Sequence, residues 1–311
     1  MTGLTVGLIG VGAFGSRVAL RLLWNGYHTL QLYDVNDIST RQFTHEHGGL
    51  TTGSPKMMAQ VCDVVITVLP SSDELREACF GWESLAKGFA PGGIVIDLGI
   101  TDPVETMTIA RELKSRGIDL VDAPAFGTPV DAKEGKLTLI VGGEEVAVAR
   151  CRPVLEILGR KVLRAGAAGS AQATSAIFDY WRGAELMAAS EAIRLGDHLG
   201  FRPGFVLSMS QELGRGDLDM VLREEVVARR FRSGISLGIL RRNIDLAAKL
   251  ATALQVRSPM LDATRAVWSD AEAKLGSGAD YTAVIKWLES LRPLPEPATD
   301  KTETPNGAAT A

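Results

Sequence analysis

The sequence predicts an α/β protein, with an N-terminal Rossmann-type domain built on a doubly wound parallel sheet and an all-helical C-terminal domain. Short, nearly continuous Val/Ile/Leu runs alternate with helical patterns as far as residue 164, which is typical of parallel strands covered on both faces. The first run leads directly into Gly10-Val11-Gly12-Ala13-Phe14-Gly15. After Gly169 the strand pattern stops and only helical periodicity continues.

Seven apolar runs are the predicted strands of the first domain. They cover residues 5–9, 29–33, 64–69, 94–98, 119–123, 137–141 and 162–164. Helices are expected between them, the first over 16–25. Ser54 is a predicted N-cap with Pro55 at the first helical position, and Pro103 is expected to open a helix that Gly117 ends. This alternation implies right-handed crossovers.

The second half is predicted to begin with one long helix over 171–199, which spans about 43 Å at 1.5 Å per residue. Further helical patterns cover 203–213, 217–229, 237–254, 258–275 and 281–290. We therefore predict a cofactor domain over 1–164 and a substrate and dimerisation domain over 165–291. Residues 292–311, rich in Pro, Thr and Ala, are expected to form a disordered tail.

The composition and net charge indicate which kinds of binding partner and which cellular compartment to expect. The net charge of −4 does not favour nucleic acid or an anionic membrane, and no run is long enough to span a bilayer. Three scattered cysteines indicate a reducing compartment, so we expect a cytoplasmic protein. His45 and His47 have no evident third ligand, so no metal site is predicted.

The glycine-rich segment predicts a dinucleotide site. Gly10 allows a tight turn, Gly12 lets a pyrophosphate approach the backbone, and Gly15 lets the helix pack closely on the strand. The N-terminus of that helix, with Ala13 and Phe14 before it, would face the phosphates. Asp34 ends the next strand, where a carboxylate binds both ribose hydroxyls and repels a 2′-phosphate. The predicted cofactor is therefore NAD.

Several further segments carry a resemblance to a known family. They are Leu69-Pro70-Ser71-Ser72, Asp97-Leu98-Gly99, Asp122-Ala123-Pro124, Gly135-Lys136-Leu137-Thr138, Val141-Gly142-Gly143, Gly166-Ala167-Ala168-Gly169 and Arg242-Asn243-Ile244-Asp245-Leu246-Ala247. In this order the chain resembles the β-hydroxyacid dehydrogenase superfamily over about residues 4–290. That superfamily includes 3-hydroxyisobutyrate and 6-phosphogluconate dehydrogenases, tartronate semialdehyde reductases and, more distantly, imine reductases. The resemblance implies a homodimer or larger oligomer, and a nicotinamide half lined by Leu69, Pro70, Ser71 and Gly99.

The chain departs from the family where the chemistry is expected. Ser175 stands in the place of the family's catalytic lysine, and Asp179 in the place of its asparagine partner. The family's Lys-Asp pair late in the chain is Arg242-Asn243 here. The substrate loop reads Asp122-Ala123-Pro124-Ala125-Phe126-Gly127-Thr128, so Phe126 replaces a substrate-contacting serine. No lysine occurs between Lys161 and Lys249, which excludes a simple shift of the lysine along the helix.

These departures predict an altered site. Asp179 and Ser175 lie four residues apart on one helical face, and they are the candidate catalytic residues together with Tyr180. If buried, Asp179 would have a raised pKa and could carry a proton or stabilise an iminium ion. In the alternative interpretation these residues are structural. Asp179 would then form an ion pair with Arg182 or Arg242, Ser175 would be a small residue at a helix contact, and Phe126 would be part of the hydrophobic core. The predicted substrate contacts are Phe126, Gly127, Thr128 and Arg242.

The sequence therefore favours an NAD-dependent oxidoreductase that moves hydride to or from a carbonyl or alcohol carbon. Its small-molecule substrate is expected to be relatively apolar and uncharged or cationic, since Asp179 would repel an acid. Three alternatives remain: an imine reductase or reductive aminase, a protein that binds NAD without turnover, and an enzyme that uses bound NAD for non-redox chemistry.

Overall fold

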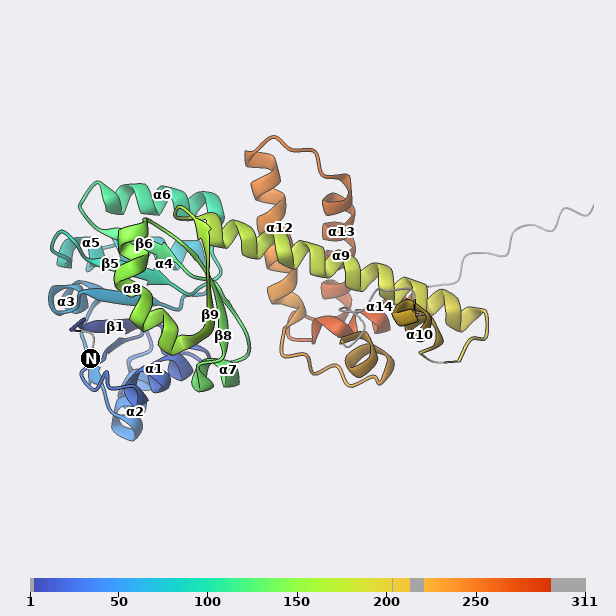
Figure 1. The fold of residues 1–311 in the computed structure, drawn as a ribbon, viewed down its shortest axis with the longest axis horizontal. Helices are drawn as coiled ribbons and strands as arrows, with labels where there is room; N and C mark the ends of the chain where they lie inside the picture. The colour runs from blue at the N-terminus through green and yellow to red at the C-terminus, as the bar shows by residue number, and fades with distance from the viewer. Residues whose placement is uncertain (1–2, 203, 213–220, 292–311) are drawn as a thin grey trace, which may run out of the picture.

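The computed structural model describes residues 3–202, 204–212 and 221–291, and it contains an α/β lobe and a helical lobe (Figure 1). The helix α9 (Ser170–His198) starts at the α/β lobe and runs through the helical lobe. The predicted tail over 292–311 lies outside the described residues, as do parts of the helices predicted over 203–213 and 217–229.

The sheet has the strand order of a Rossmann fold. Its first six strands run β3-β2-β1-β4-β5-β6 and are all parallel, which confirms the predicted fold class. The bounds are β1 (Val6–Ile9), β2 (Gln31–Tyr33), β3 (Leu50–Thr51), β4 (Val64–Thr67), β5 (Ile94–Asp97) and β6 (Asp119–Asp122). Because these strands are parallel, their carboxyl ends lie at one edge of the sheet. In this fold cofactors bind at that edge, where the strand order reverses between β1 and β4.

The far edge of the sheet departs from the predicted parallel pattern. The edge strands are β7 (Ala125–Phe126), β8 (Leu137–Gly142) and β9 (Gly159–Gly166). β8 is antiparallel to both β6 and β7, and β9 is parallel to β8. The direction reverses because the chain turns back after β7 and returns as β8 beside both β6 and β7. β3 and β7 were not predicted, because two residues are too few to show an alternating pattern.

The helices of the α/β lobe are α1 (Gly15–Trp24), α2 (Asp37–His47), α3 (Pro55–Val61), α4 (Ser72–Phe80), α5 (Leu85–Gly88), α6 (Pro103–Lys114), α7 (Pro129–Glu134) and α8 (Glu145–Leu158). The three helix starts that the sequence predicted, at residues 16, 55 and 103, are each found within one residue. The Ser54 hydroxyl accepts the Met57 amide and so caps α3 as predicted. Gly117 has a φ of 74°, which suits a residue that ends the α6 segment.

The second half is helical throughout its described residues, and the prediction of one long helix from residue 171 is confirmed by α9. The other elements are α10 (Phe205–Glu212), η1 (Leu222–Val227), α12 (Leu237–Ala253), α13 (Pro259–Leu275), η2 (Tyr281–Ala283) and α14 (Val284–Ser290). η1 is a π-helix and η2 a 3-10 turn that leads into α14, so the patterns predicted over 217–229 and 281–290 are helical where the structure describes them, although not α-helical throughout. None of the described helices is long and apolar enough to cross a membrane.

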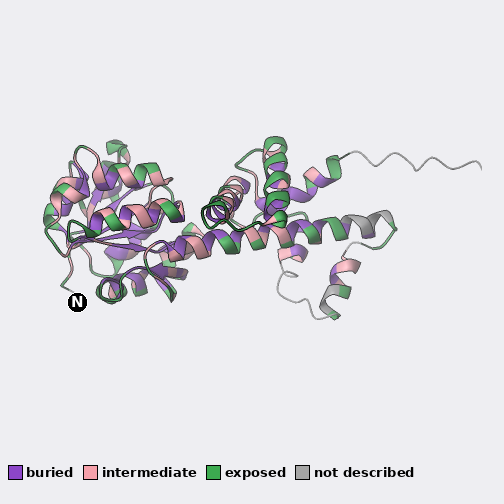
Figure 2. Ribbon diagram, turned by 90° about the horizontal axis from the view of Figure 1, so that it is seen from above, coloured by how far each residue is buried: buried purple, intermediate pink, exposed green. Residues whose placement is uncertain are grey.

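Each lobe has its own buried core (Figure 2). In the helical lobe the fully buried Trp268 of α13 donates its indole N–H to the Gly183 carbonyl of α9, 3.3 Å away. Trp181, by contrast, is 54% exposed, so it does not fill the core of this chain. Its ring stacks on Phe178, with centroids 5.8 Å apart, on the outer face of α9.

Candidate functional site

The glycine-rich turn has the geometry that a dinucleotide needs. Gly10 has a φ of 96°, and a Cβ there would lie 2.2 Å from the Val68 carbonyl oxygen. A Cβ at Gly15 would lie 1.8 Å from the Gly10 oxygen, whereas a Cβ at Gly12 would have no heavy atom within 4 Å. The N-terminus of α1 has no side-chain cap and no acidic residue in its first turn. Open space beside Gly12 and uncapped N–H groups at α1 therefore fit a pyrophosphate.

Asp34 is held against this turn by two backbone amides. Its Oδ2 accepts the Val11 N–H at 2.7 Å, and its Oδ1 accepts the Asn36 N–H at 2.8 Å. A carboxylate can accept about four hydrogen bonds, so acceptor capacity remains for ribose hydroxyls. A hollow of about 220 Å³ opens beside Val11 between α1 and α2. These residues fit the adenosine end of a dinucleotide.

The segments predicted to line the nicotinamide half meet at the ends of β4 and β5. A Cβ at Gly99 would lie 2.7 Å from the Leu69 carbonyl oxygen, so the two segments are in close contact. The Ser71 hydroxyl is used locally, where it accepts the Asp73 and Glu74 amides and caps α4. Pro70 follows Leu69 and offers its carbonyl to the helical lobe.

A buried polar network joins this edge to α9. Asp97 is fully buried and accepts hydrogen bonds from Thr67 Oγ1 at 2.9 Å and Thr101 Oγ1 at 3.0 Å. Burial raises the pKa of the Asp97 carboxyl to about 6, although these bonds oppose the rise. Gln172 Nε2 of α9 donates to the Gly99 carbonyl at 2.8 Å. The first turn of α9 is therefore fixed beside the nicotinamide-lining residues.

Asp122 supplies the cap of the long helix from across the fold. Its carboxylate accepts the N–H groups of Gly169 at 2.8 Å, and of Ala171 and Gln172 at 3.0 Å each. Burial raises the pKa of Asp122, while these bonds oppose the rise. The carboxyl end of β6 thus sets where α9 begins, and with it the position of the residues that follow.

Ser175 and Asp179 lie on one buried face of α9, with exposed fractions of 5% and 6%. Asp179 Oδ1 lies 3.3 Å from Arg182 Nη1, and Asp179 Oδ2 accepts the Nδ2–H of Asn243 on α12. Burial raises the pKa of Asp179, and Arg182 and the Asn243 bond counter part of this rise. Ser175 makes no side-chain hydrogen bond with the described residues. This face therefore holds one titratable group and one free hydroxyl.

The other predicted residues occupy different positions. Arg242 does not pair with Asp179, because its Nη1 donates to the Pro70 carbonyl at 2.6 Å and ties α12 to the nicotinamide-lining loop. Tyr180 is half-buried and packs against the core of the helical lobe. Of the two ion pairs in the structural alternative, the one between Asp179 and Arg182 is present.

The predicted substrate loop lies on the edge strand β7. Phe126 is half-buried, and Gly127 has a φ of 147° that favours glycine. The Thr128 hydroxyl accepts the Asp131 amide and caps α7, so it already has a local role. A Cβ at Gly234 would lie 3.0 Å from Thr128 Cγ2, which places the helical lobe directly against this loop.

Sequence reasoning missed roles for Gln172, Asn243, Asp97 and Asp122. The last two stand in quoted family motifs, but their strand-end positions alone do not reveal what they contact. Asn243 had a usable signal: it replaces the family's aspartate while Asp179 replaces the family's asparagine, and such paired changes indicate contact.

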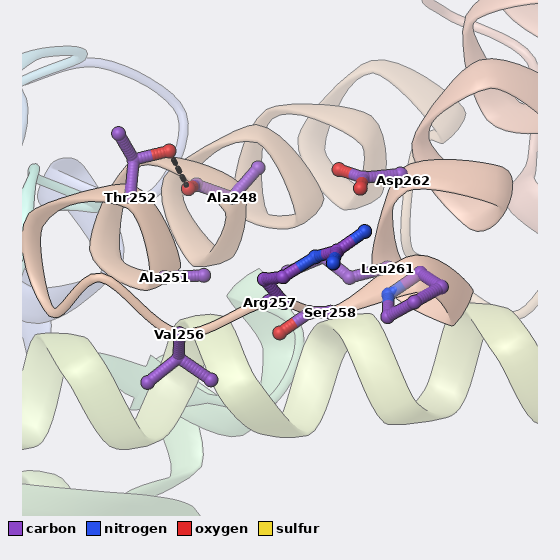
Figure 3. Close-up of a pocket in the computed structure, with 9 residues that line it drawn as sticks. Ala248, Ala251, Thr252, Val256, Arg257, Ser258, Leu261 and Asp262 are labelled. Carbon is purple, nitrogen blue, oxygen red and sulfur yellow. Dashed lines mark hydrogen bonds between the residues drawn. The ribbon is translucent and has the colours of Figure 1, made fainter.

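A larger hollow lies away from these groups. A pocket of about 330 Å³ occurs at the turn between α12 and α13, lined by residues that include Arg257, Ser258 and Asp262 (Figure 3). The dashed bond there joins Thr252 Oγ1 to the Ala248 carbonyl within α12. None of the predicted site residues lines it.

Known proteins match both halves of the chain. Residues 5–166 match the NAD binding domain of 6-phosphogluconate dehydrogenase, and residues 169–288 match the NAD-binding family of NADP-dependent 3-hydroxyisobutyrate dehydrogenase. Mitochondrial 3-hydroxyisobutyrate dehydrogenase of Bos taurus is 30% identical over 295 residues, covering 91% of this chain and 86% of that protein.

Solved structures share the fold. 3-Hydroxyisobutyrate dehydrogenase of Mycobacterium tuberculosis with L-serine aligns with a TM-score of 0.84 at 22% identity, covering 92% of this chain and 99% of that one. An imine reductase variant of Myxococcus stipitatus with NAD+ aligns with a TM-score of 0.62 at 18% identity, covering 92% and 99%. The chain therefore belongs to the β-hydroxyacid dehydrogenase superfamily of nicotinamide-dependent oxidoreductases.

Proposed function

We propose that this enzyme transfers hydride between NAD(H) and a carbonyl or alcohol carbon of a relatively apolar substrate that is uncharged or cationic. The observation that carries the proposal is the buried Asp179 carboxylate on α9, one turn beyond the residue that replaces the family lysine. Asp179 would hold or release the proton that accompanies hydride transfer. Ser175 and Phe126 would line the same pocket, and the bound nicotinamide would supply the hydride.

The cofactor is proposed to be NAD because Asp34 is fixed where the ribose hydroxyls bind in this fold. Arg41 on α2 is paired with Asp37 at 2.6 Å, so its charge is already balanced against a carboxylate. We expect tighter binding of NADH than of NADPH, and a loss of this preference in Asp34→Ala with NADH binding weakened about tenfold. Titrating both reduced cofactors measures this, with Asp270→Ala, which removes an exposed carboxylate of the helical lobe, as the control. Tighter binding of NADPH by the native protein would contradict the assignment.

A second candidate is an imine reductase or reductive aminase. It is favoured by the structural likeness to the imine reductase of Myxococcus stipitatus and by the loss of the family lysine. A panel of neutral ketones, cyclic imines, ketone–amine mixtures and 3-hydroxyacids, each followed by NADH formation or consumption, separates the candidates. Turnover of imines or ketone–amine mixtures alone would identify an imine reductase or reductive aminase. Turnover of 3-hydroxyacids alone would contradict both candidate functions. Cofactor binding without any turnover would indicate the alternatives in which NAD is bound but not used for redox chemistry.

We also propose a homodimer formed through the helical lobe. Ile177, Phe178 and Trp181 form an exposed apolar stripe on α9, which a second copy would cover. Light scattering at micromolar concentration should therefore give at least twice the 33.2 kDa chain mass. A 33.2 kDa particle would rule this assembly out.

We propose a cytoplasmic location for the protein. Its three cysteines are free and buried, which supports the reducing compartment that the sequence predicts.

A further inference from the structure

Asp179 and Asn243 form a buried pair that joins α9 to α12. Their exposed fractions are 6% and 2%, and Asn243 Nδ2 donates to Asp179 Oδ2. The other end of the amide, Asn243 Oδ1, is buried and has no hydrogen-bond partner among the described residues. The pair therefore contains one acceptor that this part of the chain leaves unsatisfied.

The chemistry of the pair explains why the unsatisfied atom is an acceptor. An ionised Asp179 only accepts hydrogen bonds, so the amide must turn Nδ2 toward it and Oδ1 away. Buried polar atoms without a partner are rare in folded proteins, and a bound ligand is one way to satisfy them. A hydroxyl or amino group can donate to Oδ1, whereas a carboxylate cannot and would also be repelled by Asp179.

The pair lies on the parts of α9 and α12 that reach the nicotinamide-lining segments. Gln172, which donates to the Gly99 carbonyl, precedes Asp179 by about 10 Å along the helix axis. Arg242, next to Asn243 in sequence, donates to the Pro70 carbonyl. Arg182 balances part of the Asp179 charge through Oδ1, but it does not contact Asn243 Oδ1.

We propose that Asp179 and Asn243 together bind the hydroxyl or amino group of an otherwise apolar substrate, with Asn243 Oδ1 accepting its hydrogen. This rests on the proposed function only in placing the substrate beside Asp179. Compared with the family pattern, the two residue types are exchanged: the family has asparagine at the position of Asp179 and aspartate at the position of Asn243. The exchange keeps one hydrogen bond between the helices, but it moves the carboxylate onto α9.

The test compares ligands that share one apolar ring, so that burial of the ring cancels. Calorimetry on the full chain with saturating NADH measures cyclohexanol against methoxycyclohexane, which cannot donate, and cyclohexylamine against cyclohexanecarboxylate. At about pH 8 the native protein should prefer the first member of each pair at least tenfold. Equal binding within either pair overturns the proposal, as does the absence of saturable binding of cyclohexanol and cyclohexylamine.

Two variants separate the two acceptors. Asn243→Leu should lose the preference for cyclohexanol over its ether and keep the preference for the amine, because the Asp179 charge remains. Asp179→Asn should do the reverse, because Asn243 Oδ1 remains while the charge is gone. Asp270→Asn, which removes an exposed carboxylate of α13, should change neither preference. If the Asn243→Leu protein fails to fold, the native measurements and Asp179→Asn still decide. Because binding needs no turnover, a protein that shows both preferences without redox activity refutes the proposed function and leaves this inference standing.

Discussion

Asp179→Asn is expected to lower kcat by at least about tenfold, with NAD(H) affinity little changed. General acid–base groups contribute about 10²- to 10⁴-fold, and an amide can neither release nor take up the proton. Ser175→Ala should cost less, because a serine hydroxyl does not titrate near neutral pH. Steady-state kinetics on a substrate identified from the panel, with cofactor titrations, measures both variants. An unchanged kcat in Asp179→Asn together with an inactive Ser175→Ala would reverse the roles proposed on α9.

The pH profile adds a readout that a merely structural aspartate would not alter. Burial raises the pKa of Asp179, so more of it is protonated near neutral pH than of an exposed aspartate. In the reductive direction the protonated form is the active one, so kcat should fall as the pH rises through this raised pKa. In the oxidative direction kcat should rise over the same range. Both limbs should disappear in Asp179→Asn.

Restoring the family lysine alone should not create a hydroxyacid dehydrogenase. In Ser175→Lys the new ammonium would lie one turn from Asp179 and pair with it, which leaves it unavailable to substrate. Phe126 would still stand where the family has a substrate-contacting serine. Measurable 3-hydroxyisobutyrate oxidation by this single variant would contradict our account of the pocket.

Gly15→Ala is expected to destabilise the fold, whereas Gly12→Ala is expected to weaken cofactor binding and leave the stability nearly unchanged. At Gly15 the added Cβ would meet the Gly10 backbone oxygen at 1.8 Å, and backbone cannot move aside as a side chain can. The free energy of unfolding should fall by about 3 kcal/mol or more. At Gly12 the added Cβ has no neighbour within 4 Å, so stability without cofactor should stay within about 0.5 kcal/mol.

Gly12→Ala should nevertheless weaken NADH binding by about tenfold or more, because the methyl group would occupy the space where the pyrophosphate approaches the backbone. Denaturant unfolding without cofactor and NADH titration measure the two effects separately. The assignment of this turn to a dinucleotide would be wrong if Gly12→Ala bound NADH as tightly as the native protein does.

The sequence alone determined the features of this protein that depend on neighbouring residues, namely its strands, several helix starts and the glycine-rich turn. Val/Ile/Leu runs predict buried parallel strands, Ser54 and Pro103 mark helix starts, and the spacing of Gly10, Gly12 and Gly15 predicts the turn before α1. Each of these signals lies within a few residues of the feature that it specifies. For the same reason the sequence could predict that Asp179 and Ser175 share a face of α9.

Contacts between distant segments were decided only by the tertiary structure. Asp179 meets Asn243 across 64 residues and Arg242 meets Pro70 across 172 residues, and no periodicity encodes such pairings. The reversal at β8 and the cap that Asp122 gives α9 likewise depend on how the edge of the sheet packs. The burial that raises the pKa of Asp179 also exists only once α12 covers that face of α9, because desolvation is a property of the packed helices and not of the residue.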